Sequence, residues 1–184
     1  MELTHYLRIQ AHANRLSNHR LHAAMAPLPR EQFHAPRTGF FPSLAETLNH
    51  ILWVDLYYVG ALHGEPDLRA TMDGFVASDE LTGLAARQAA SDARLVAFCD
   101  ALDAAALDRE VQMPRATHIQ RDRVGHVLAH LFNHQTHHRG QAHAMLLGTP
   151  IKPPQLDEFM MPSEAHLRVH DMAALGWRED AVYR

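Results

Sequence analysis

The sequence predicts an all-α protein, an antiparallel four-helix bundle in one domain. Four stretches of roughly 22–26 residues have apolar residues at helical spacing, and proline or glycine separates each stretch from the next. The chain of 184 residues has the usual size of a single domain and can bury a core without disulfides. Apolar residues make up 47% of it and charged residues 21%, which is typical of a folded globular protein. Long helices joined by modest loops pack side by side, so a bundle is expected.

The first two helices have clear boundaries in the sequence. The first is expected over residues 3–25, because prolines follow it closely. The second is expected to begin after Ser43, which has the spacing of a capping box with Glu46. In that motif the serine hydroxyl caps one free backbone N–H and the glutamate carboxylate caps another. This helix should end near the Gly-Glu-Pro segment at residues 64–66.

The third and fourth helices are predicted in the second half of the chain. The third should follow Ser78 and run to about residue 102, since Asp79 and Glu80 suit the positive end of a helix dipole. The fourth should run over about residues 122–147, where a Gly-Thr-Pro segment ends it.

The remaining segments carry weaker patterns. Residues 107–119 alternate loosely and are expected to form a short hairpin or an irregular loop before the last long helix. Beyond the bundle, assigned to residues 1–160, a C-terminal extension of residues 161–184 is expected to pack on the same domain. A short helix is predicted in it at about residues 163–175.

Composition excludes several classes of protein. The single cysteine, Cys99, rules out an internal disulfide framework and a cysteine-based zinc site, and it fits a reducing compartment. The formal net charge of −4 gives no sign of a nucleic-acid-binding face. We find no apolar run long enough for a membrane span and no signal-peptide pattern at the N-terminus. We therefore expect a cytoplasmic protein that binds neither nucleic acid nor membrane.

Histidine is the unusual residue, with 16 copies dispersed along the chain. On a helical wheel of the fourth helix with His134 at zero, the apolar stripe centres at about 70° and His138 lies at about 40°. These two histidines therefore lie in the stripe or at its edge. The other histidines of this helix turn away from it: His126, His130, His137 and His143.

The pair His134 and His138 is a candidate metal site. Side chains four residues apart on a helix lie about 5–6 Å apart, so both imidazoles can bind one cation. Two imidazoles in apolar surroundings would otherwise leave unpaired nitrogens, at about 1–3 kcal/mol each. The alternative is that each ring bonds a carbonyl or water. A third ligand would have to come from the second helix, where the pattern alone does not decide between His50 and Asp55.

The first helix has a different histidine pattern. His5, His12 and His19 repeat at heptad spacing but lie opposite the apolar stripe of their helix. We therefore expect them to be solvated surface residues. Ile9 and Leu16 share this outer face, which leaves a helix-packed dimer interface possible there.

Two segments resemble the DinB-like (DNA-damage-inducible) family of four-helix-bundle metalloproteins. Residues 130–141, HLFNHQTHHRGQ, are similar to the family signature in which an H-x-x-x-H pair followed by R-G-Q closes the last helix. Residues 48–55, LNHILWVD, resemble its L-N-H-I…D segment on the second helix. The lead-in at residues 39–43 and the segment at 154–157 are also similar, so the resemblance covers about residues 3–160.

The resemblance implies a metal site and its ligands. The ligands would be His50, His134 and His138, with a 130/134 pair as an alternative because His130 lies one turn earlier. Asp55 and Gln141 would be the candidate catalytic residues, and with Arg139 they would line or support the site.

The resemblance also implies a function. Three imidazoles leave a divalent cation an open coordination position, as in catalytic zinc sites. Imidazole ligands suit zinc or nickel, with iron or copper as alternatives. The wider superfamily implies a homodimeric thiol S-transferase acting in detoxification or the stress response, on a small-molecule thiol and an electrophile.

Two other functions remain open at this point. One is a metal-dependent hydrolase, with Asp55 or Glu46 as the general base. The other is a non-catalytic metal- or ligand-binding stress protein, which the many surface histidines favour. The sequence lacks the motifs of zinc proteases (HExxH), of phosphate-binding loops and of CxxC sites.

Overall fold

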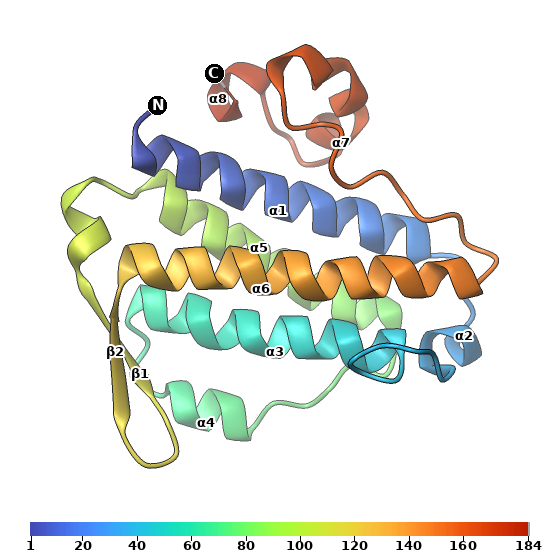
Figure 1. The fold of residues 1–184 in the computed structure, drawn as a ribbon, viewed down its shortest axis with the longest axis horizontal. Coiled ribbons are helices and arrows are strands. Elements are labelled where there is room, and N and C mark those ends of the chain that lie inside the picture. The colour runs from blue at the N-terminus through green and yellow to red at the C-terminus, as the bar shows by residue number, and fades with distance from the viewer. Residues whose placement is uncertain (184) are drawn as a thin grey trace.

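The computed structural model describes residues 1–183 and shows the predicted all-α bundle (Figure 1). Its four long helices begin and end close to the predicted positions: α1 (Leu3–Met25), α3 (Leu44–His63), α5 (Leu81–Asp100) and α6 (Val124–Met145). Helix α1 is antiparallel to α5, and α3 is antiparallel to α6 (Figure 1). However, α3 and α5 run in the same direction, because the connection between them returns along the length of the bundle. Helices α1 and α6 also run in the same direction, so neighbouring helices are antiparallel within these two pairs and parallel between them (Figure 1).

The start of α3 depends on Ser43. Its hydroxyl accepts a hydrogen bond from the backbone N–H of Glu46 at 3.1 Å, which satisfies one of the free donors of the first turn. The Glu46 carboxylate accepts from the Ser43 hydroxyl at 3.3 Å. Only half of the predicted capping box is therefore present, since the carboxylate bonds the side chain rather than the backbone N–H.

Several short elements connect the long helices. The sequence analysis did not predict the short helices α2 (Arg30–His34) and α4 (Leu68–Asp73). The hairpin before α6 is present, but it lies later than predicted and is formed by β1 (Glu110–Pro114) and β2 (Ile119–Arg123). Helix α6 consequently begins at Val124. The remaining elements are three 3₁₀ helices, Ala105–Asp108, Leu146–Gly148 and Pro162–Leu167, and the helices α7 (Val169–Ala174) and α8 (Glu179–Val182).

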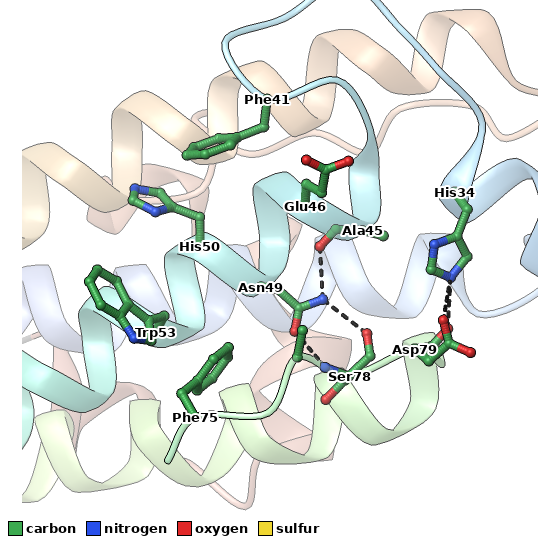
Figure 2. Close-up of a pocket in the computed structure, with 11 residues that line it drawn as sticks. His34, Phe41, Ala45, Glu46, Asn49, His50, Trp53, Phe75, Ser78 and Asp79 are labelled. Carbon is green, nitrogen blue, oxygen red and sulfur yellow. Dashed lines mark hydrogen bonds and ion pairs between the residues drawn. The ribbon is translucent and has the colours of Figure 1, made fainter. Parts of the chain in front are cut away.

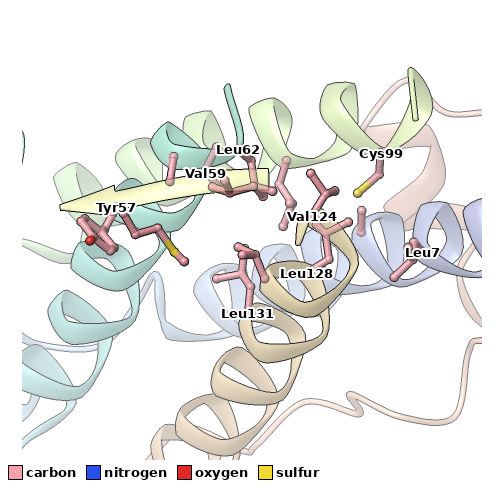
Figure 3. Packing of buried hydrophobic residues seen from close by; sticks show 14 of the residues in the cluster. Leu7, Tyr57, Val59, Leu62, Cys99, Val124, Leu128 and Leu131 are labelled. Carbon is pink, nitrogen blue, oxygen red and sulfur yellow. The ribbon is translucent and has the colours of Figure 1, made fainter. Parts of the chain in front are cut away.

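Large apolar side chains from all four long helices form the core at the end of the bundle nearest the hairpin (Figure 3). Val111 and Met113 of β1 join it, and both are almost completely buried. Cys99 lies in the same cluster, and burial raises the pKa of its thiol to about 12. A thiol that stays protonated is a poor nucleophile, so Cys99 has a packing role.

The C-terminal segment covers the outer face of α1 (Figure 1). Phe159, Met172 and Val182 pack there against Leu16, which is fully buried. Arg168 holds the segment together from inside, through an ion pair with Glu179. The interpretation of this face as a dimer interface is therefore wrong for Leu16, because the chain's own C-terminal segment occupies it.

The same packing overturns the prediction for His12, which is 3% exposed rather than solvated. Its Nε2 atom lies 2.9 Å from a carboxylate oxygen of Asp100 in α5. The indole of Trp177, from the C-terminal segment, stacks edge-on against its ring at a centroid distance of 4.4 Å. A wheel of α1 alone could not reveal this, since the covering residue lies more than 160 positions away in the sequence.

Within residues 1–183, no helix combines the length and apolar character needed to cross a bilayer.

Two helix glycines are predicted to respond in opposite ways to alanine. Gly140 lies exposed in α6, and a Cβ there would meet no atom within 4 Å. We expect Gly140→Ala to raise the free energy of unfolding by about 0.5–1 kcal/mol, because alanine loses less backbone entropy on folding. Gly64 ends α3 with φ of 72°, a left-handed conformation that strains alanine. Gly64→Ala should therefore lower the free energy of unfolding by about 1 kcal/mol. Urea unfolding of the metal-free variants measures both; a destabilised Gly140→Ala protein contradicts the analysis of α6.

Candidate metal centre

Three histidine rings converge between α3 and α6. One ring nitrogen each from His50, His134 and His138 lies within 4.8 Å of the others. The Nε2 atoms of His50 and His134 are 3.0 Å apart. Helical spacing places His134 and His138 one turn apart on the same face of α6, and the antiparallel α3 brings His50 opposite them. We call these residues the histidine cluster.

The cluster fits a divalent cation. Two nitrogens that each lie about 2.0–2.1 Å from one ion, at angles of about 90–110°, are separated by about 2.9–3.4 Å. The 3.0 Å between His50 and His134 falls in that range. The Nε2 atom of His134 faces His50, so it is the nitrogen of this ring that would bind the cation. A bound cation would explain why two ring nitrogens lie this close together in a largely apolar setting.

The protonation states of the cluster also suit metal binding. Burial is the main cause that lowers the pKa of His134 to about 3, and the neighbouring histidines lower it further. Burial also lowers the pKa of His50 and of His138. The rings are therefore neutral at pH 7, the form in which an imidazole nitrogen offers a lone pair to a metal.

Gln141, one of the candidate catalytic residues, supports the cluster. Its Oε1 atom lies 2.9 Å from Nδ1 of His138, and its amide nitrogen lies 3.0 Å from Nε2 of His137. If Nδ1 of His138 donates to Gln141, its Nε2 atom is left with a free lone pair. Gln141 therefore orients a possible ligand.

The alternative pair is less well placed. The ring of His130 lies 6.3 Å from that of His134, between centroids, and packs on Tyr58 at 4.9 Å. The group of nitrogens that lie close enough to share an ion contains His50, His134 and His138 without His130.

Asp55, the other candidate catalytic residue, lies inside the bundle. It is 1% exposed, and its Oδ2 atom accepts from Gln88 at 2.6 Å and from Gln135 at 2.7 Å. The pattern left His50 and Asp55 open as partners of the α6 pair; the structure brings His50 to it and turns Asp55 toward α5 and α6.

Asp55 belongs to a buried polar layer that connects the four long helices. Asn18 of α1 donates to Asp92 of α5 and to Gln135 of α6, and Arg139 donates to Asn14 and Asn18. We call this set the polar layer: Asn14, Asn18, Asp55, Gln88, Asp92, Gln135 and Arg139. The sequence analysis missed most of it, although Gln88 and Asp92 lie four apart among the apolar residues of α5.

The polar layer has perturbed acid–base properties. Burial raises the pKa of Asp92 to about 6. Burial and the nearby Asp92 carboxylate raise the pKa of Asp55 well above its usual value. Burial also lowers the pKa of Arg139, to about 10. Two carboxyl groups thus share one buried guanidinium, so the layer favours protonation of a carboxyl group.

A cavity of about 670 Å³ opens beside the histidine cluster, and we call it the histidine cavity. It has the size of a small-molecule site. All three cluster histidines line it, together with aromatic rings of Phe40, Trp53, Tyr57 and Tyr58. Its charged lining residues are Arg69, Asp73 and Arg115, from α4, from the end of α4 and from the hairpin turn. The sequence analysis assigned no role to any of these three.

A second cavity, of about 440 Å³, shares His50 and Trp53 with the first (Figure 2). Phe41 and Phe75 form its walls. The amide of Asn49 closes its floor by hydrogen bonds with the backbone of Ser78, at 2.7 and 2.9 Å. Glu46 lines this second cavity and not the histidine cavity.

A protein-family model described as the DinB family matches residues 4–169, which is most of the chain. No curated protein matches the chain.

The raised pKa of Asp92 predicts how stability depends on pH. Between its unfolded value of about 4 and its folded value of about 6, the folded state binds more protons, so the free energy of unfolding falls as pH rises. This carboxyl group accounts for up to about 3 kcal/mol of that fall. In Asp92→Asn this part of the slope should vanish. Urea unfolding of the metal-free proteins between about pH 4 and 7 measures it.

The pH dependence of the free energy of unfolding should be compared between wild type and Asp92→Asn. The buried histidines act in the opposite direction, since the lowered pKa values of His22 and His134 make stability fall as pH drops below about 6.5. Their effect is common to both proteins and cancels. The Asp55 carboxyl acts in the same direction as Asp92, and because the Asp92 charge raises its pKa, its contribution should also shrink in Asp92→Asn. Parallel pH profiles for the two proteins would show that Asp92 titrates normally when folded.

Proposed function

The chain belongs to the DinB family, and from this membership and the histidine cluster we propose that it binds one divalent cation and transfers a small thiol to an electrophile. The ligands are His50, His134 and His138. The single observation that carries the proposal is that these three rings face one another at the wall of the histidine cavity. A cation held there is within reach of a small molecule.

The histidine cavity supports thiol chemistry better than hydrolysis. The hydrolase considered from sequence needs a carboxylate beside the cation as its general base. Among the lining residues that the structure describes, only Asp73 carries a carboxylate, and it is exposed and paired with Arg69 at 3.6 Å. Asp55 and Glu46, the bases considered from sequence, lie in the polar layer and in the second cavity. A thiol would need no such carboxylate, because a divalent cation held by the cluster would itself favour loss of the thiol proton.

The protein's own residues have distinct roles in this proposal. The three neutral imidazoles add no negative charge, so the site keeps the full charge of the cation and attracts an anionic sulfur. Gln141 orients His138. The aromatic walls of the histidine cavity exclude water from the reacting groups and bind the apolar part of a substrate.

Three finer statements belong to the same proposal. Zinc or nickel is the cation that we expect, because three imidazoles with an open position suit both. The homodimer and the cytoplasmic location stay predictions. Since the C-terminal segment covers Leu16, any dimer must form through another surface.

The metal site itself predicts a stoichiometry. Untagged protein should carry about one divalent ion per chain, and His50→Ala or His134→Ala should abolish tight binding, because two imidazoles hold an ion far more weakly than three. His130→Ala is the matched control: it removes a histidine that also lines the cavity and should keep the ion. Elemental analysis after gel filtration measures this. A stoichiometry well above one, unchanged in His50→Ala, favours the non-catalytic metal-binding alternative.

The proposed activity has a direct assay. The metal-loaded protein should conjugate cysteine or glutathione to monochlorobimane, and both a chelator and His138→Ala should abolish the reaction. Gln141→Ala should weaken metal binding by about 10–100-fold, as the loss of such supporting hydrogen bonds usually does. Ester hydrolysis without added thiol would support the hydrolase instead. A metal-loaded protein that conjugates neither thiol would count against the proposal.

A further inference from the structure

Arg115 places an unpaired positive charge in the wall of the histidine cavity. It lies just after β1, in the hairpin turn, and is half-buried. Within residues 1–183, no carboxylate forms an ion pair with it, although many surface arginines of this chain have such partners. A guanidinium that is partly removed from water and lacks a counter-charge is a favourable place for an anion.

The guanidinium is held in one orientation. Its Nε atom donates to Gln120 at 2.9 Å, and Nη2 donates to the hydroxyl of Tyr58 at 3.1 Å. It also lies over the ring of Tyr57, 5.0 Å from the centroid. These contacts use two of the five N–H donors of an arginine, and Nη1 bonds none of the described residues. The remaining donors therefore have no partner among the described residues and are free to bond a ligand.

The neighbouring charged residues do not neutralise the positive charge of Arg115. Asp73, the carboxylate of the cavity, is exposed and pairs with Arg69. Arg69 in turn donates to the backbone carbonyls of Arg115 and Ala116 at 3.3 Å, which ties α4 to the hairpin turn. Apart from its histidines the cavity lining carries one net positive charge, from Arg69 and Arg115 against Asp73, and a bound divalent cation would add two more. Such a cavity selects anionic ligands.

Arg115 and the histidine cluster lie at separate places on the cavity wall. The ring of Tyr58, bonded to Arg115, packs on His130, and His130 faces His134. The contacts that link the guanidinium to the cluster therefore run through two intervening rings. A ligand that reaches both must carry its acidic group several bonds away from its reacting atom.

We propose that Arg115 binds the carboxylate of the substrate, so that the histidine cavity takes small molecules with a carboxylate at one end and the reacting sulfur at the other. This inference rests on the proposed function for the sulfur end only. A charge-assisted, bidentate contact of this kind is expected to favour a carboxylate over the matching amide by about tenfold or more.

Binding to the metal-free protein tests the carboxylate contact by itself. The probes are N-acetylmethionine and N-acetylmethionine amide, which differ in the carboxylate alone and contain no thiol. Calorimetry on wild type should show the expected preference for the acid, and Arg115→Gln should remove most of it. Arg115→Lys should restore part of it, because lysine keeps the charge but not the fork of donors. Added salt should reduce it.

Arg121→Gln is the matched control. Arg121 lies on β2 of the same hairpin, is exposed, and pairs with Glu110 outside the cavity. This variant should keep the acid preference of wild type. Circular dichroism of all three variants checks that the hairpin substitutions leave the fold intact. No preference for the acid in wild type, or an unchanged preference in folded Arg115→Gln, overturns the inference.

A second assay separates this inference from the proposed function. With N-acetylcysteinylglycine and its C-terminal amide as thiols for monochlorobimane, the ratio of kcat/KM values should favour the acid in wild type and fall about tenfold in Arg115→Gln, through KM. Turnover of both thiols with the same ratio in the two proteins supports the thiol transferase and overturns the carboxylate contact. If neither thiol is turned over but the binding preference for the acid depends on Arg115, the carboxylate contact is supported and the thiol transferase is overturned.

Discussion

The polar layer across the middle of the bundle is the constraint on which the site depends. Gln135 and Arg139 directly follow His134 and His138 in α6, and both point into the bundle, where Asp55 and the asparagines of α1 bind them. Adjacent helix residues project about 100° apart. Fixing the side chains of the second residue in each pair therefore fixes the rotation of α6, and this turns both histidines toward α3.

Burying so many polar groups costs folding free energy, and what the layer provides is one specific arrangement of the helices. Apolar clusters fill the bundle on either side of it, one around Leu62 and Leu128 and one around Leu44 and Ala142. Apolar helix faces tolerate small rotations and shifts of register, because many packings bury a similar area. A buried carboxylate and amides have far fewer satisfactory arrangements. The layer thus gives up some stability and defines one relative placement of α3 and α6, which brings His50 to the pair.

The cavity draws on a different part of the chain. The histidines belong to the bundle, whereas Arg69, Asp73 and Arg115 come from α4 and the hairpin turn, which pack beside one end of α3 (Figure 1). The histidine end of the cavity is therefore set by the rigid helices, and its charge is set by connecting segments. Connecting segments accept substitutions more readily than a packed core. Substitutions in these segments would thus change the charge of the cavity without disturbing the placement of the histidine cluster.

The sequence by itself determined the local features: the four long helices and the pairing of His134 with His138, because helix caps and the 3.6-residue period depend on neighbouring positions. It could not choose between His50 and Asp55 from the pattern of α3, and it placed His12 in solvent. Those outcomes depend on what packs against each face: Gln135 holds Asp55, and Trp177 covers His12. The entry of Arg115 into the cavity likewise required the hairpin and α4 to meet. Only the tertiary structure decides such contacts, because they join residues whose separation in sequence carries no periodic signal.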